Sequence, residues 1–217
     1  MVSETIKMMV PLPTPDQSLR YFDDYKVPGN IKAHCLRVRD VSRFLAEHLF
    51  QTGQTINVEF TDRLGIFHDL FKVVALSELK PNRFHDYVHT PEERAMWKKL
   101  RMQYPNMYEG EVAYLVFKDE FPELALALKK VSNPRETDFS WEEKIVHYVD
   151  VRVFQDTIVS IADRLVYLRE RYPRNDNAWD LFEQKIRKLE QEIFSQLPFS
   201  PEDVKPLIEK GALSPSP

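Results

Sequence analysis

Apolar side chains recur at steps of three and four along most of this chain, which is the spacing of one face of an α-helix. Two such stripes are formed by His34, Val38, Val41 and Leu45 and by Phe60, Leu64, Phe67 and Phe71. Strand-type alternation is nearly absent, and the 217 residues include only five glycines. We therefore expect an all-α protein whose core is built from packed amphipathic helices.

Prolines, glycines and capping residues divide this pattern into separate helices. Ser140 and Glu143 form a capping box, and Pro173 ends the helix that we expect to be the longest. Its apolar stripe consists of Phe154, Ile158, Ile161, Leu165 and Leu168. The expected helices span residues 14–27, 30–50, 92–103, 109–118, 123–130, 140–172 and 175–196, and two others begin at 57 and 200.

A chain of this length can form one sizeable domain with short extensions. We expect an irregular N-terminal arm over residues 1–13, a helical domain over 14–172, C-terminal helices packed on that domain over 173–210 and a disordered tail over 211–217. The exposed face of the 175–196 helix could serve a homodimer, or it could simply cap the core.

Composition excludes several classes of protein. The net charge of −4 argues against general nucleic-acid binding. The single cysteine, Cys35, cannot form an internal disulfide, which favours a reducing compartment. There is no apolar run of about 20 residues, the length that spans a bilayer, and no signal-peptide pattern. We expect a cytoplasmic protein that does not enter a membrane.

His68 and Asp69 are adjacent polar residues in the otherwise apolar segment 64–72. Burying an imidazole beside a carboxylate is costly unless a partner satisfies both groups. A divalent ion can do so, because this pair of ligand types suits Mn, Fe, Co, Ni or Zn. The doublet alone is weak evidence for a metal site.

Two further polar residues, His34 and Asp150, lie on the apolar faces of other expected helices. A lone core histidine is more often satisfied by the protein, and a lone buried aspartate is more often paired with arginine. Helices pack about 8–10 Å apart, so inward side chains from three helices can nevertheless meet at one ion. Together with His68 and Asp69 they would leave an octahedral ion two open positions, as a catalytic metal requires.

The order His34, His68-Asp69, Asp150 resembles the ligand pattern of the HD-domain superfamily of metal-dependent phosphohydrolases. The resemblance covers roughly residues 16–172 and includes the segments 30–38, 64–72 and 148–152. It implies an all-helical HD fold and one divalent ion (Mn, Fe, Co, Ni, Zn or Mg) held by His34, His68, Asp69 and Asp150. It implies a small phosphorylated substrate, such as a nucleotide, that is cleaved at a phosphoester bond.

The chain also departs from that pattern. Many HD-domain proteins carry further histidines for a second metal, and this chain has Met107, Tyr108, Val131 and Ser132 where we would expect them. The departure favours a mononuclear centre and argues against the superfamily's diiron oxygenases. It also leaves open a catalytically inactive module that binds a nucleotide or a partner. A second doublet, His85-Asp86, lies in a polar loop and could approach the cleft or remain exposed.

Positive charge near the metal would stabilise a phosphate leaving group. The resemblance assigns phosphate contact to Lys72, and Arg37 and Arg152 are further candidates because arginine suits bidentate phosphate contact. Each of the three could instead form a surface ion pair. Asp69 could accept a proton from the attacking water, so Asp69 and Lys72 are the candidate catalytic residues.

Overall fold

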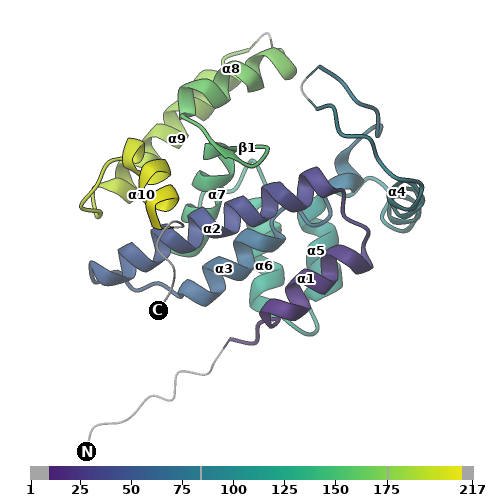
Figure 1. The fold of residues 1–217 in the computed structure, drawn as a ribbon, viewed down its shortest axis with the longest axis horizontal. Helices are drawn as coiled ribbons and strands as arrows, with labels where there is room; N and C mark the ends of the chain where they lie inside the picture. Colours follow the sequence, from purple (N-terminus) through teal and green to yellow (C-terminus); the bar gives the residue numbers. More distant parts are fainter. Residues whose placement is uncertain (1–9, 84, 175, 212–217) are drawn as a thin grey trace, which may run out of the picture.

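The expected all-α architecture is confirmed in the computed structural model, which describes residues 10–83, 85–174 and 176–211. The described residues form ten α-helices, two 3₁₀ turns and one short hairpin (Figure 1). The elements are α1 (Pro15–Asp24), α2 (Gly29–Gln51), α3 (Val58–Phe67), η1 (Lys72–Ala75), α4 (Pro91–Gln103), α5 (Glu109–Phe117), α6 (Pro122–Val131), α7 (Trp141–Arg152), β1 (Val153–Phe154), β2 (Thr157–Ile158), α8 (Ile161–Arg171), α9 (Ala178–Phe194), η2 (Pro201–Asp203) and α10 (Val204–Gly211).

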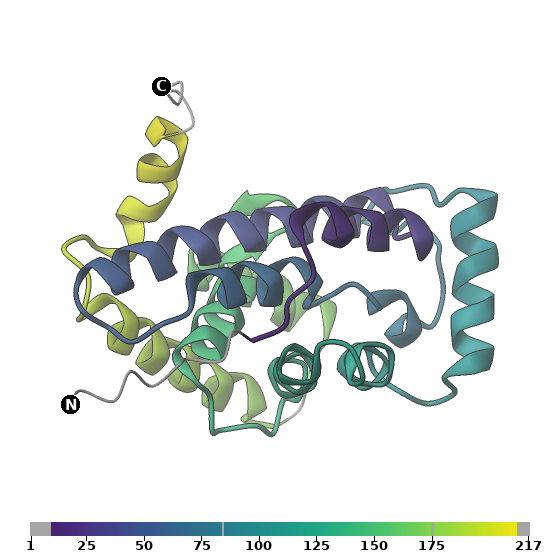
Figure 2. The same cartoon turned by 90° about the horizontal axis from the view of Figure 1, so that it is seen from below.

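The helix α2 crosses the molecule, with α3 packed along it and α7 against both (Figure 1). The helix α4 lies at one end of the molecule and α10 at the other (Figure 2). Gly65 allows α3 to approach α2 closely, because a β-carbon there would lie 3.0 Å from the Arg39 Cα atom. This close approach brings the C-terminal end of α3 beside the N-terminal half of α2, where the candidate metal ligands lie.

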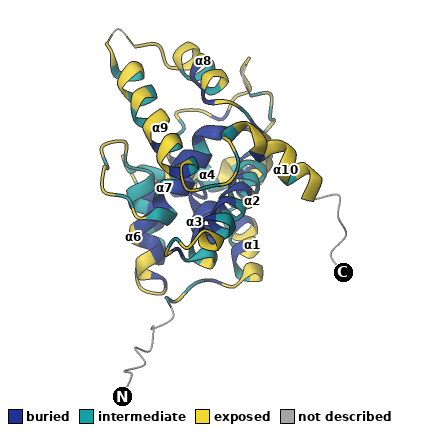
Figure 3. Ribbon diagram, turned by 90° about the vertical axis from the view of Figure 1, so that its left-hand side faces the viewer, coloured by how far each residue is buried: buried dark blue, intermediate teal, exposed yellow. Residues whose placement is uncertain are grey.

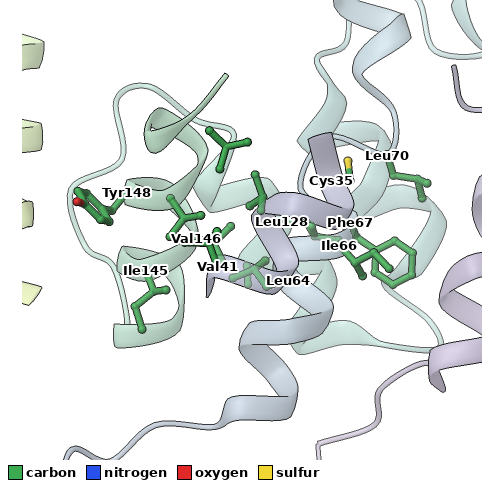
Figure 4. Close-up of a cluster of buried hydrophobic side chains, with 14 of the residues drawn as sticks. Cys35, Val41, Leu64, Ile66, Phe67, Leu70, Leu128, Ile145, Val146 and Tyr148 are labelled. Atoms are coloured by element: carbon green, nitrogen blue, oxygen red, sulfur yellow. The ribbon is translucent and has the colours of Figure 1, made fainter. Parts of the chain in front are cut away.

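The core lies between α2, α3, α6 and α7. Val41, Leu64, Leu128 and Val146 gather in its centre (Figure 4), and each is at most 1 % exposed. Burying a side chain of this size stabilises the fold by about 1.5–3 kcal/mol. The helices α9 and α10 are largely exposed by contrast (Figure 3), so most of the buried side chains lie on the central helices.

Capping residues set several helix starts where the sequence predicts them. Thr14, Thr90 and Ser140 each form a full capping box, in which the side chain accepts a hydrogen bond from the third residue of the helix. The observed α4, α5 and α6 agree with their expected ranges to within one residue.

The single helix expected over residues 140–172 is wrong. The helix α7 ends at Arg152, an antiparallel hairpin pairs Val153 with Ile158, and α8 starts at Ile161. Several residues in between are β-branched, which favours strands over helix. Ser160 then caps α8 by accepting a hydrogen bond from the Asp163 N–H. The apolar steps of three and four continued across the hairpin and concealed this interruption.

The helix α3 ends at Phe67, so His68 and Asp69 lie in a tight turn rather than within a helix. Bonds between residues three apart, from Leu70 N–H to the Phe67 carbonyl and from Lys72 N–H to the Asp69 carbonyl, hold this turn. It directs both polar side chains of the doublet toward the same cluster.

The chain ends agree with the expected arm and tail only in part. Residues 10–13 lie outside the helices, whereas Gly211, which we expected in the tail, ends α10. The remainder of both segments lies outside the described residues. Within the described part of the chain, no helix is long and apolar enough to cross a membrane.

Candidate metal centre

The four predicted ligands lie together. One ligand atom from each of His34, His68, Asp69 and Asp150 falls within 4.8 Å of all the others. The His34 Nε2 atom lies 3.0 Å from Asp150 Oδ1 and 3.2 Å from His68 Nε2. The His68 Nε2 atom lies 3.5 Å from Asp150 Oδ1 and 3.9 Å from Asp69 Oδ2. Residues from α2, the turn after α3 and α7 thus form one cluster that could hold a metal ion.

Backbone carbonyls orient both imidazoles. The His34 Nδ1 atom lies 2.8 Å from the Gln155 carbonyl oxygen, and the His68 Nδ1 atom lies 2.8 Å from the Gly65 carbonyl oxygen. A carbonyl can only accept, so each Nδ1 carries the proton and donates it. In neutral imidazoles the two Nε2 atoms therefore present lone pairs to the centre of the cluster, which is the arrangement that metal-binding histidines use.

The inward lone pairs and two carboxylates require a positive charge between them. Two unprotonated nitrogens 3.2 Å apart repel each other, and both lie close to an anionic oxygen. Without a metal ion, a proton on one of the ligand atoms must supply this positive charge. Burial opposes that proton, but the Asp69 charge and the Asp150 carboxylate outweigh burial and raise the pKa of His68 to about 9. Since the proton's place is shared by several ligand atoms, a divalent ion can replace it.

The spacing of the cluster fits such an ion. Ligands about 2.1 Å from a metal are separated by about 3.0 Å in octahedral and about 3.4 Å in tetrahedral geometry. The separations among the ligand atoms of His34, His68 and Asp150 are 3.0, 3.2 and 3.5 Å. The Asp150 side chain is 39 % exposed, whereas that of His68 is 5 % exposed. The centre is therefore anchored on one side and open to solvent on the other, so water or a substrate could reach a bound ion.

Asp69 uses its two oxygens differently. Its Oδ2 atom faces His68, while its Oδ1 atom lies 3.3 Å from the Lys72 ammonium. The Lys72 Nζ atom also donates to Glu109 Oε1 at 2.9 Å. Burial opposes the lysine charge, but Asp69 and Glu109 together raise the pKa of Lys72 well above its usual value. Lys72 is thus a fixed positive charge beside the candidate metal position.

The two candidate arginines differ in position. The Arg37 Nε atom donates to the Asp156 carbonyl at 2.8 Å, next to the Gln155 carbonyl that orients His34. Arg37 and the metal ligand His34 are therefore held by neighbouring carbonyls of the same hairpin turn.

Arg152 does not join the centre, because residues two apart on a helix point in widely different directions. Its guanidinium donates to the Val159 carbonyl at 2.5 Å and to Glu190 Oε2 at 3.0 Å. It also donates to the Tyr148 hydroxyl and the Pro201 carbonyl. The expected phosphate contact of Arg152 does not agree with this buried, fully engaged position.

Two other reactive side chains near the centre have separate environments. Cys35 is fully buried, and burial raises the pKa of its thiol well above the usual value, so it is a poor nucleophile. His85 is not among the residues of the cluster. Its Nε2 atom instead lies 2.9 Å from the Tyr167 hydroxyl.

Sequence reasoning missed the groups that support the ligands. Glu109, only 12 % exposed at its side chain, looked like an ordinary first-turn acid of a helix. Gly65 had a readable signal, since a glycine inside a helical stripe indicates a close approach. The Gln155 carbonyl had none, because it depends on the hairpin that the sequence concealed.

Comparisons of the sequence with protein-family models, with curated proteins and with solved structures found no match.

Proposed function

We propose that this protein is a metal-dependent phosphohydrolase. The observation that carries the proposal is the convergence of His34, His68, Asp69 and Asp150 with both imidazole lone pairs turned inward. A purely structural cluster would not need one face open to solvent, yet the Asp150 side chain is 39 % exposed. We further propose that the chain is an HD-domain protein, because the order of its ligands and the segments around them resemble those of that superfamily.

Each residue of the centre has a role in the proposed reaction. A bound divalent ion would lower the pKa of a water molecule and so supply a nucleophile near neutral pH. Asp69 would accept a proton from that water, since its Oδ2 atom faces the candidate ligand atom of His68 and so lies next to the position of the ion. The Lys72 ammonium would bind phosphate oxygens and stabilise their charge as the phosphoester bond breaks. Arg37, held at the hairpin turn by the Asp156 carbonyl, would provide a further contact to the phosphate.

Lys72 also favours one ion rather than two. Two-metal sites place their ions about 3.5–4 Å apart, commonly around a shared carboxylate. In this chain the outer oxygen of Asp69 is already paired with the Lys72 ammonium, which Glu109 holds from the other side. The ammonium thus supplies the second positive charge that a second ion would bring. We propose a mononuclear centre with a small phosphate ester, such as a nucleotide, as the substrate.

Phosphate release tests the proposal. The metal-free protein would be loaded separately with Mn²⁺, Co²⁺, Ni²⁺, Zn²⁺ or Mg²⁺ and given a panel of nucleotides and simple phosphate esters. We expect release that a chelator abolishes and that Asp69→Ala loses. His48→Gln is the matched control, because His48 also bonds to a backbone carbonyl, that of Phe44, but lies outside the cluster.

The same experiment separates the inactive alternative. If no metal supports release, but a nucleotide raises the melting temperature of the metal-loaded protein, the chain is a binding module and not an enzyme. If neither release nor stabilisation occurs, the centre has no phosphorylated ligand in the panel and the proposed function is wrong.

A further inference from the structure

A cluster of aromatic rings and one arginine lies beside the metal centre, on β1, α8 and the loop before α4. It consists of Phe154, Tyr167, Arg164 and His85, and we term it the aromatic–arginine cluster. The Phe154 and Tyr167 rings lie 4.5 Å apart, centre to centre. The Arg164 guanidinium lies over both, 5.3 Å from the Phe154 ring and 5.0 Å from the Tyr167 ring. Two aromatic rings, tilted by 47° to each other, and a planar cation are thus brought together.

The hairpin turn connects this cluster to the metal centre. Phe154 is followed by Gln155, whose carbonyl orients His34, and by Asp156, whose carbonyl accepts from Arg37. Consecutive Cα atoms are only about 3.8 Å apart, so the cluster begins one residue from a contact to a candidate ligand. Gln155 adopts a positive φ of 56°, which is uncommon outside glycine and gives the turn its tight shape. In Figure 1 the hairpin lies between α2 and α8.

The cluster has an unused polar group. The Arg164 Nε atom is buried and has no hydrogen-bond partner, and Arg164 forms no ion pair within the part of the chain that the structure describes. A buried donor without an acceptor costs free energy comparable to a lost hydrogen bond. An acceptor on a ligand would remove that cost. A planar ring that stacks on the aromatic faces and carries nitrogen or oxygen acceptors at its edge would satisfy both features of the cluster.

We infer that the aromatic–arginine cluster is the subsite for a planar heteroaromatic group of the substrate, such as a nucleobase. The subsite rests on the proposed function, in which the phosphate of the same molecule lies at Lys72 and Arg37. His85 ties the loop before α4 to this subsite through the Tyr167 hydroxyl. Burial and the neighbouring Arg164 lower the pKa of His85, so it is neutral near pH 7 and can donate or accept.

A hollow elsewhere in the molecule is an alternative site for a planar ring of the substrate. A hollow of about 490 Å³ lies between η1 and the segment joining α4 to α5, and Tyr104, Arg101 and Tyr108 are among its lining residues. There the arginine is already engaged, because Arg101 Nη1 donates to the carbonyls of Val74 at 3.2 Å and Leu76 at 2.5 Å. The cluster with the unsatisfied Arg164 is therefore the better match, and Tyr104 provides a matched control.

Kinetic selectivity tests the subsite in the metal-loaded protein. The ratio of kcat/KM for adenosine and cytidine 5′-monophosphates to that for ribose 5-phosphate, which lacks a base, measures the contribution of the base. We expect Tyr167→Leu and Arg164→Gln to lower this ratio about 10-fold, since stacking on one aromatic side chain is worth about 1–3 kcal/mol. Arg164→Lys should lower it less, and Tyr104→Leu should leave it unchanged. An unchanged ratio in Tyr167→Leu, or a fall in Tyr104→Leu instead, would overturn the inference.

A binding measurement keeps this test separate from the proposed catalysis. Saturation-transfer NMR on the chelator-treated protein with 1 mM adenosine requires neither metal nor turnover. We expect the base protons to receive saturation in the wild type and in Tyr104→Leu, and to lose it in Tyr167→Leu. If phosphate esters are cleaved but adenosine gives no signal and the kinetic ratio is near one, the subsite is wrong while the phosphohydrolase stands. If adenosine binds as expected without any turnover, the proposed function fails and the subsite stands.

Discussion

The Nε2 atoms of His34 and His68 lie 3.2 Å apart, and each imidazole has its other nitrogen bonded to a backbone carbonyl. Two carbonyls from distant parts of the chain, those of Gly65 and Gln155, thus fix the direction of both lone pairs. Neutral histidines in this arrangement repel each other unless a cation lies between them. This relationship explains why the centre should bind a proton or a metal ion tightly.

Stability of the metal-free protein should fall as the pH rises from about 6.5 to 9. The folded-state pKa of His68 is raised from 6.5 to about 9, so its stabilising contribution is complete below the unfolded pKa and is lost as pH passes the folded one. The loss should be on the order of 3 kcal/mol. Urea unfolding at pH 6, 8 and 10 with a chelator measures it. His68→Gln should make the free energy of unfolding nearly independent of pH over this range. If the variant and the wild type lose stability equally, a group other than His68 causes the loss.

Lys72→Met should reduce kcat/KM for a phosphate ester by about 10- to 100-fold, because a charge-assisted hydrogen bond is worth about 1.5–3 kcal/mol. The variant should keep its metal, since the lysine is not a ligand and its removal takes a positive charge away from the ion. Steady-state kinetics and metal analysis of the same preparation check both parts. Loss of the metal together with turnover would show that Lys72 acts by supporting the ligands instead.

Gly65→Ala should destabilise the fold by about 1–3 kcal/mol, the usual cost of overpacking a core. The added β-carbon would lie 3.0 Å from the Arg39 Cα atom and 3.3 Å from its backbone nitrogen, so α3 must move away from α2. Because α2 carries His34 and the turn that follows α3 carries His68, metal affinity should fall as well. Gly53→Ala is a poor control, since Gly53 has a φ of +95°. Gly211→Ala, which meets nothing within 4 Å, is the suitable one.

Arg152→Met should lower stability, whereas Arg37→Met should weaken substrate binding. The first removes the buried partner of Glu190 and should cost about 3 kcal/mol of stability, while metal affinity stays unchanged. The second should leave stability nearly unchanged and raise the KM for a phosphate ester. Thermal unfolding and kinetics on both variants test the assignment. A rise in KM confined to Arg152→Met would restore that residue to the phosphate site.

The sequence predicted the ligands well because each of them interrupts an apolar stripe at a position where a polar group is costly. His34 and Asp150 could be recognised in this way, and the tight turn at His68-Asp69 did not disturb the prediction. Arg152 could not be placed without the hairpin, whose backbone carbonyl at Val159 binds it. Glu109 was equally hidden, since its role depends on the packing of α5 against η1 and not on a local pattern. Periodicity together with a capping residue predicted where helices such as the one after Ser140 begin. It failed to predict where α7 ends, because β-branched residues and a turn kept the same spacing.

Calorimetric titration of the metal-free protein with Mn²⁺ tests the central claim most directly. We expect one ion per chain, release of about one proton at pH 8, and affinity reduced at least about 100-fold in Asp150→Ala, as loss of one of four protein ligands should cause. His48→Gln should match the wild type. Binding that is unchanged in Asp150→Ala, or no binding at millimolar Mn²⁺ by a folded wild-type protein, would contradict the account.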